Sequence, residues 1–124
     1  MFSFDFRCYG PSVEQICQPD RQCDLGSGLP NQSMAAALEN LDAQALIGQQ
    51  TIVDLDMVRC CISGLWLFQD FLDESHVLSQ QVHTATGSYW HAIMHRREPD
   101  YSNSKYWYRK VPEHEVFVQL CESA

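Results

Sequence analysis

Apolar residues recur at helical spacing through the middle of this chain, and that periodicity is the feature that most constrains its fold. One helical pattern carries Leu55, Val58, Ile62, Leu65 and Leu72. Alternation of apolar and polar residues over strand lengths is scarce. With 124 residues, 45% of them hydrophobic, the chain is long enough for one domain with a real core and too short for two. The sequence therefore predicts a mainly α, single-domain helical bundle.

The N-terminal quarter of the chain has a different pattern from the rest. Residues 1–31 mix Phe, Cys, Pro and Gly without sustained periodicity, so we expect an irregular arm there. Residues 32–124 form the predicted helical core. We predict that residues 1–124 form a single domain that consists of these two parts.

Capping residues and glycines place the ends of the expected helices. Asn31 or Ser33 caps the first helix, which Gly48 stops, and Thr51 with Asp54 opens a long central helix. A last short element after Pro112 is expected to close the core with its apolar residues. The expected helices span about 33–46, 51–78, 86–98 and a short stretch from 102, and the last element covers 115–120.

Two histidines one helical turn apart form the most informative motif of the chain. The helix that carries them is expected to begin with Thr86 or Ser88 as its cap and to end before the next proline. On a helix that advances ~100° per residue, His91, His95 and Glu98 fall within roughly 60° of one another. The pair lacks the adjacent glutamate of a His-Glu-x-x-His metalloprotease, so we exclude that activity.

A second polar stripe follows the core face of the predicted central helix. Steps of four, three and four residues carry Gln69, Asp73, His76 and Gln80. Burying such a stripe costs ~1–3 kcal/mol for each group left without a hydrogen-bond partner. The stripe therefore needs a partner surface or a ligand.

The short connection between the two helices favours antiparallel neighbours, so the two polar stripes are expected to face each other. This arrangement brings together three imidazoles, those of His76, His91 and His95, with one or two carboxylates. Neutral imidazole and carboxylate groups suit zinc, iron, manganese or nickel. We therefore predict a divalent-metal site with these histidines as ligands, and with Asp73 as a further ligand or as a partner that fixes a histidine tautomer.

Such a site has a catalytic interpretation. Hydrolysis of a small anionic substrate follows if Asp73 or Glu98 accepts a proton from bound water and Arg96 holds the anion. Glu98 precedes a proline, which disfavours helical geometry at that position. Two alternatives stand beside this hypothesis: a metal-free module that binds a small ligand or a protein, and a polar network that is purely structural. The pattern does not decide whether the protein is an enzyme.

A segment dense in aromatic residues offers a candidate ligand pocket. Ser102 is a plausible cap for a short helix that includes Asn103, Tyr106 and Trp107. We predict that these last three residues, with Arg96, contact a ligand. The alternatives are that the aromatic side chains supply core area and that the arginine pairs with a nearby carboxylate.

Charge and hydropathy exclude some partners. The formal net charge of -8 repels phosphate groups, which argues against nucleic acid and against an anionic membrane surface. No segment is long and apolar enough to span a bilayer. Small-molecule ligands and proteins remain as partners, and a homo-oligomer is compatible with each hypothesis.

The first residues and the cysteines bear on localisation. Residues 1–6 lack both a basic region and an uninterrupted apolar run, so they do not predict a secretory signal. Of the six cysteines, Cys60 and Cys61 are neighbours in a helical pattern, and the others lack Cys-x-x-Cys spacing. We therefore expect free thiols and a cytoplasmic protein.

Three stretches also carry a family resemblance. They are residues 71–76 (Phe-Leu-Asp-Glu-Ser-His), residues 90–98 (Trp-His-Ala-Ile-Met-His-Arg-Arg-Glu) and Tyr106-Trp107. Together they resemble a family of small uncharacterised proteins, over about residues 60–118. That family has no known activity, fold or ligand, so the resemblance implies no catalytic residues.

Overall fold

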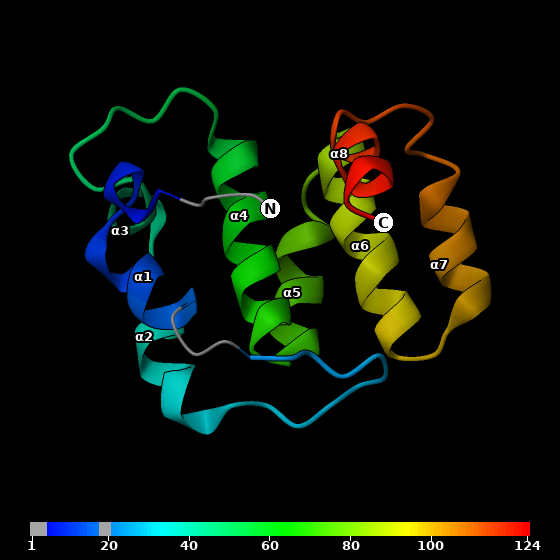
Figure 1. Cartoon of the computed structure of the whole chain (residues 1–124), viewed down its shortest axis with the longest axis horizontal. Coiled ribbons are helices and arrows are strands. Elements are labelled where there is room, and N and C mark those ends of the chain that lie inside the picture. The colour runs from blue at the N-terminus through cyan, green and yellow to red at the C-terminus, as the bar shows by residue number, and fades with distance from the viewer. Residues whose placement is uncertain (1–4, 18–20) are drawn as a thin grey trace.

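Helices are the only regular elements in the parts of the chain that the computed structural model describes, residues 5–17 and 21–124 (Figure 1). This confirms the prediction of a mainly α helical bundle. In chain order the helices are η1 (Phe6–Cys8), α1 (Pro11–Cys17), η2 (Gln32–Met34), α2 (Ala35–Glu39), α3 (Ala43–Ile47), α4 (Leu55–Phe68), α5 (Leu72–Ser79), α6 (Ala85–Arg97), α7 (Tyr101–Tyr108) and α8 (Val116–Ser123).

Helix α4 lies at the centre of the bundle. On one side it packs against α2 and α3, to which α1 is joined, and on the other side against α5 and α6, with α7 beyond α6 (Figure 1). The main core is formed where α1 to α4 meet, by Val13, Ile16, Leu38, Leu41, Leu46, Val58, Ile62, Trp66 and Phe71. Among the described residues, no helix combines the length and hydropathy needed to cross a membrane.

The predicted central helix is wrong in its extent, because it divides into α4 and α5. Asp54 is its N-cap and accepts a hydrogen bond from the backbone N–H of Met57 at 3.1 Å. The break falls at Asp70, whose φ of 65° lies in the left-handed region that a helix cannot contain. Gln69 turns inward at the same point and donates to the carbonyl of Ile16 at 2.7 Å. The polar stripe is therefore split between two helices.

The N-terminal part is more ordered than the sequence pattern predicts. Residues 1–31 contain η1 and α1, and α1 buries Val13 and Ile16 in the core, so the arm is irregular only in part. Residues 1–4 of this arm lie outside the described residues. The first predicted helix of the core is also interrupted, because Asp42 caps a separate α3 by accepting from the N–H of Ala45 at 2.7 Å. Gly48 ends α3 with φ of 65°, as the sequence indicated.

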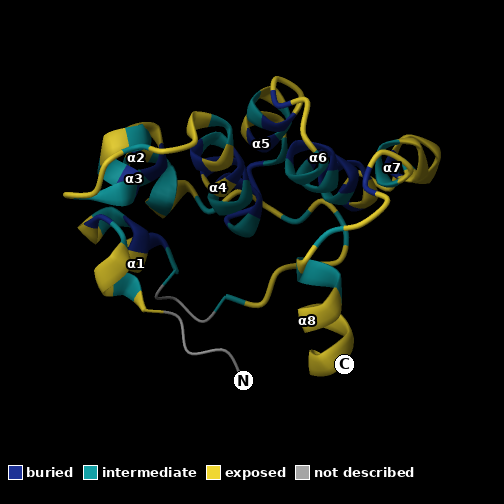
Figure 2. Cartoon of the chain, turned by 90° about the horizontal axis from the view of Figure 1, so that it is seen from above, coloured by how far each residue is buried: buried dark blue, intermediate teal, exposed yellow. Residues whose placement is uncertain are grey.

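The later helices begin at different caps from those predicted. Thr84 caps α6 through a hydrogen bond from the N–H of Gly87 at 3.2 Å, and Asp100 rather than Ser102 caps α7. The last helix, α8, was expected to close the core and does not. It contains no buried residue and stands apart from the bundle in Figure 2. Leu120, for example, is 50% exposed.

Candidate metal centre

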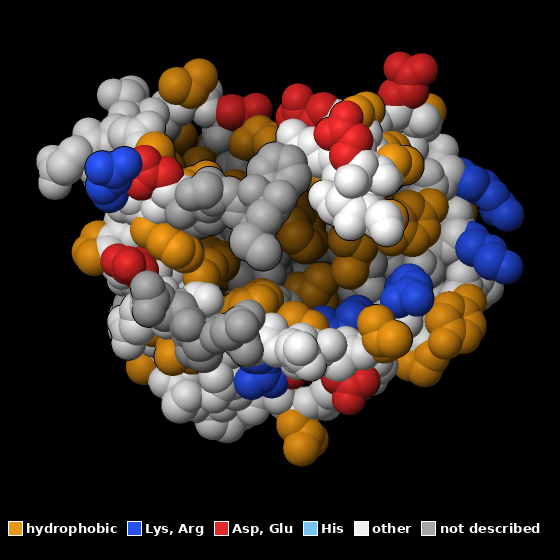
Figure 3. Space-filling model, in the orientation of Figure 1, with side chains coloured by type: hydrophobic (Ala, Val, Ile, Leu, Met, Phe, Trp, Pro, Cys, Tyr) orange, Lys and Arg blue, Asp and Glu red, His pale blue; other side chains and the backbone are white. Residues whose placement is uncertain are grey.

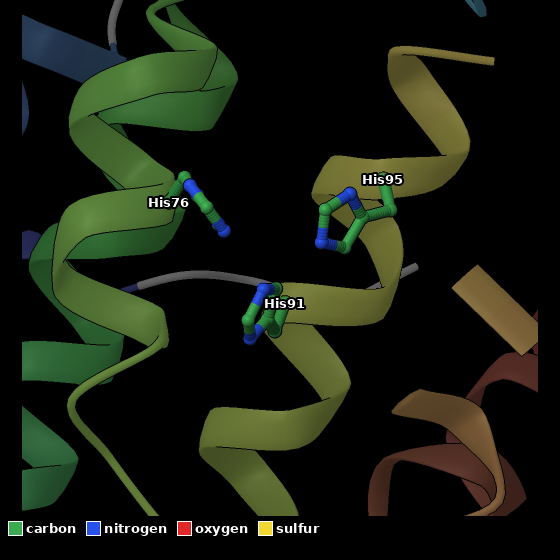
Figure 4. A group of neighbouring side chains, drawn as sticks. All are labelled: His76, His91 and His95. Carbon is green, nitrogen blue, oxygen red and sulfur yellow. The ribbon is translucent and has the colours of Figure 1, made fainter. Parts of the chain in front are cut away.

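Three histidines converge between α5 and α6, as the two polar stripes predicted. His76 comes from α5, and His91 and His95 lie one turn apart on α6. Their ring centroids are 4.7, 5.2 and 4.8 Å apart for the 76–91, 76–95 and 91–95 pairs. Figure 4 shows the imidazoles around one space between the two helices. One ligand nitrogen from each residue lies within 4.8 Å of the other two.

Local packing holds α5 and α6 in this arrangement. The turn between them is tight at Gly87, where a Cβ atom would lie 2.2 Å from the carbonyl oxygen of Val82. Only glycine fits there, so the start of α6 lies directly against the chain that leaves α5. On the far side of α6, the buried Ser104 of α7 donates to the carbonyl of Ala92 at 2.8 Å. The cluster is therefore positioned by contacts on both sides of α6.

His91 is the most unusual member of the cluster. It is only 3% exposed, and neither of its ring nitrogens has a hydrogen-bond partner among the described residues. Its ring stacks on Trp107 with centroids 3.9 Å apart. Burial, reinforced by His76 and His95, lowers the pKa of His91 to about 4. His91 is consequently neutral near pH 7, the state in which imidazole binds metals.

His95 has the opposite arrangement, because one of its nitrogens is already used. Nδ1 lies 3.0 Å from Oε2 of Glu98, and the carboxylate can only accept, so Nδ1 carries the proton. In the neutral imidazole, that bond leaves Nε2 as the nitrogen with a free lone pair. Metal-binding histidines commonly donate their other ring N–H to a carboxylate in this way, which fixes the tautomer and raises the basicity of the ligand. Glu98 is thus placed beside the cluster as the sequence predicted, despite preceding a proline.

A second group of potential ligands shares His95 but is better explained as a helix cap. It contains His95, Glu98 and Asp100. The carboxylate of Asp100 accepts from the backbone N–H of Asn103 at 3.3 Å and from the Asn103 side chain at 3.0 Å. The oxygens of Asp100 therefore accept hydrogen bonds from the first turn of α7, and the carboxylate of Glu98 accepts one from His95.

The other predicted catalytic residue, Asp73, is exposed on α5, one turn before His76. It lines a pocket of about 460 Å³ together with Glu98. Glu39 and Glu74 lie in the same lining, and no lysine or arginine is among its described residues. The described lining of this pocket is therefore strongly acidic and disfavours an anionic substrate. It contains none of the three histidines, and Glu98 is its link to them.

The predicted ligand-binding residues do not form one pocket. Arg96 is exposed, and the side chain of Asn103 is engaged with the cap of α7. Tyr106 is 48% exposed, whereas Trp107 covers His91. Lys110 lies over both aromatic rings, 4.9 and 5.0 Å from their centroids. Of these four residues, only Trp107 belongs to the candidate centre.

Sequence reasoning missed a buried ionic cluster at the C-terminal end of α6. Arg97, which is 6% exposed, pairs with Asp70, and Arg21 binds the same carboxylate. Burial alone would raise the pKa of Asp70, but the hydrogen bonds from the two arginines outweigh burial and lower it. A signal was present in the sequence, because Arg97 follows Ile93 and Met94 by four and three residues and so shares their apolar face.

Comparison with known proteins adds no assignment to this geometry. No protein-family model matches the chain, and no curated protein or solved structure matches it either. The resemblance over residues 60–118 therefore stays a prediction. The chemistry of the three-histidine cluster has to be argued from its own residues.

Proposed function

We propose that the protein binds a divalent transition-metal ion through His76, His91 and His95. The observation that carries this proposal is the pair of buried His91 nitrogens, for which residues 5–17 and 21–124 provide no hydrogen-bond partner. A buried polar group left unpaired costs ~1–3 kcal/mol, and such groups are rare in native proteins. A metal ion would bind the unprotonated nitrogen of His91. It would also explain why the rings of His76 and His95 converge on the same space.

The donor set fits zinc and similar ions. Three histidines with one open position are the ligand pattern of many catalytic zinc sites, and imidazole also suits copper, iron and nickel. Zn–N bonds of about 2.0–2.1 Å require ligand nitrogens about 3.4 Å apart in a tetrahedral site. The nitrogens here lie within 4.8 Å of one another, so small side-chain rotations would close the site. Glu98 would then orient His95 from behind.

Metal-assisted hydrolysis is the finer part of the proposal. An ion with an open position lowers the pKa of bound water toward 7. Asp73, one turn before His76 on α5 and in the lining of the acidic pocket, is the candidate proton acceptor. Glu98 lines the same pocket, but Nδ1 of His95 already engages it. The carboxylates of that pocket favour a cationic or neutral substrate over the anionic substrate expected from Arg96. Ester and amide substrates of each charge, compared in the metal-loaded protein and in His91→Phe, test this part separately.

Cobalt titration of the metal-free protein tests metal binding directly. Co²⁺ bound by nitrogen ligands gives visible d–d absorption, and cysteine ligation would add a thiolate charge-transfer band, so the spectrum separates the histidines from the thiols. We expect saturation at one ion per chain with no thiolate band. The same ion should quench Trp107, which stacks on His91 at 3.9 Å.

Two histidine variants make the test specific. His91→Phe should abolish the absorption while circular dichroism shows an intact helical fold, because Phe keeps the stacking on Trp107. His83→Phe, at an exposed histidine, should bind Co²⁺ like the unmodified protein. Absent saturation, retained binding in His91→Phe or a thiolate band would each refute the proposal and leave a metal-free network as the better explanation.

A further inference from the structure

An apolar pocket opens on the face where α1 and α6 flank α4. It has a volume of about 280 Å³ and is lined by residues of α1, α3, α4 and α6 together with Tyr9. Figure 3 shows hydrophobic side chains along a hollow on this face. The pocket has no described lining residue in common with the histidine cluster or with the acidic pocket.

The walls of this pocket are large side chains that the core does not cover. Val13 and Leu46 are each 2% exposed, but Leu65, Phe68 and Trp90 are only half-buried where they line the pocket. Concave surface lined mainly by apolar and aromatic side chains is the usual setting of a small-molecule site.

Gly64 shapes one side of the pocket. A Cβ atom at this position would lie 2.8 Å from the ring of Trp90. The absence of that atom lets the indole lie directly against α4, as a flat wall next to Leu65 and Phe68. Any larger residue would push the indole away from α4. The small residue in this otherwise bulky apolar helix therefore positions an aromatic surface.

The described residues of the lining carry no charge, which limits the ligand the pocket can take. The polar groups are the hydroxyl of Tyr9 and the thiols of Cys17 and Cys61. Burial raises the pKa of both thiols, so they stay neutral near pH 7. A charged ligand would lose hydration here without gaining a counter-ion.

We propose that this pocket binds a small, uncharged apolar molecule, an aromatic compound or a short acyl chain. An apolar protein cavity of about 150 Å³ is sufficient to bind benzene. The larger volume of 280 Å³ admits a molecule of two-ring or short-acyl size. Trp90 and Phe68 offer ring faces for contact. The proposal does not depend on metal, because Trp90 and His91 point about 100° apart on α6.

Fluorescence titration with N-phenyl-1-naphthylamine, a neutral apolar probe, tests this inference. We expect saturable binding of one probe per chain, energy transfer from Trp90, and displacement by 1-octanol but not by sodium octanoate at equal concentration. Binding should be unchanged in the presence of a chelator and in His91→Phe, so that failure of the metal proposal and failure of this one are distinguishable.

A pair of cysteine variants locates the probe. Cys61→Phe places a large side chain in the mouth of the pocket and should weaken probe binding at least about tenfold. Cys121→Phe adds the same group on exposed α8, away from the pocket, and should bind like the unmodified protein.

Three results would overturn the inference. One is the absence of saturable probe binding, and another is equal binding in both cysteine variants. The third is a protein that does not bind the probe and forms a dimer that the Cys61→Phe substitution dissociates. A second copy of the chain would then occupy the pocket. Sedimentation of each variant, run with the titration, reads out that last result.

Discussion

Helix α6 takes part in two buried polar clusters of opposite character. At its C-terminal end, Arg97 donates to the carboxylate of Asp70, to the carbonyl of Gly26 at 2.7 Å and to the carbonyl of Leu67 at 3.2 Å. In its middle, His91 is as deeply buried, but neither of its nitrogens has a hydrogen-bond partner in the described parts of the chain. Arg97 is paired within the protein and His91 is not, although Arg21, the outer member of the ionic cluster, also has a buried Nε without a partner among the described residues.

The difference separates a cluster that joins elements of the fold from the cluster for which metal binding is proposed. The ionic cluster joins the loop of residues 21–30 to the ends of α4 and α6, and it accounts for the left-handed conformation of Asp70 at the break between α4 and α5. Each hydrogen bond that the Arg97 side chain donates ties α6 to a residue of another segment: Gly26, Leu67 or Asp70. The histidine cluster joins α5 to α6 but leaves both buried nitrogens of His91 without a partner among the described residues, which is the property expected of a ligand-binding site.

The largest effect is expected from breaking the ionic cluster. Asp70→Asn keeps a residue that tolerates the left-handed conformation but leaves Arg97 as a buried charge without its counter-ion. We expect the free energy of unfolding to fall by about 3–5 kcal/mol, with or without metal. Urea denaturation measures it. Asp73→Asn, an exposed control three residues away, should change the stability by less than about 0.5 kcal/mol. Similar losses in the two variants would contradict a structural role for Asp70.

The second effect is a pH dependence that belongs to His91. Its pKa is about 4 in the folded protein and near 6.5 when unfolded, so the unfolded chain binds more protons between these values. Stability is therefore fully present above pH 6.5 and falls as the pH drops toward 4, by up to about 3 kcal/mol.

Denaturation with chelator present, at several pH values, isolates this contribution. His91→Phe has no titrating group at the position, so its stability should fall less steeply between pH 6.5 and 4 than that of the unmodified protein. Carboxylates elsewhere titrate equally in both proteins and cancel in the comparison. Parallel stability curves would show that His91 is not held neutral by the fold.

The third effect concerns the carboxylate behind the histidine cluster. Glu98→Gln removes the charge that orients His95, and we expect metal affinity to fall about 10–100-fold. Competition with a calibrated chelator measures the affinity. Glu74→Gln removes a charge from the same acidic pocket without contacting His95 and should change the affinity far less. Equal losses would mean that only the general field of the pocket matters.

The smallest effect is expected at the arginine next to Arg97. Arg96 is exposed on α6, so Arg96→Gln should change stability by less than about 0.5 kcal/mol and leave Co²⁺ affinity unaltered. Arg97→Gln should unfold the protein much more readily. A strong loss of metal or substrate binding in Arg96→Gln would restore the anion-binding role that the sequence suggested for this residue.

Local patterns determined much of the helical content and one face of the candidate site. The four-residue spacing of His91 and His95 places them on one side of a helix in any fold, because 3.6 residues make one turn. Glu98 follows by the same geometry. Gly48 ends α3 because glycine adopts φ of 65° without strain. These features depend only on residues close in the chain.

Contacts between distant residues decided the rest. The central helix breaks at Asp70 because its carboxylate binds Arg21 and Arg97, which lie 49 and 27 residues away and which periodicity cannot detect. Tertiary packing likewise decides the roles of the two neighbouring arginines. Arg96 is exposed to solvent, whereas Arg97 pairs with the buried carboxylate of Asp70. The stacking of Trp107 on His91 and the convergence of His76 with α6 also required α5, α6 and α7 to pack. The spacing of residues along the chain determines which of them share a helix face. Only the packing of the helices determines which residues that face contacts.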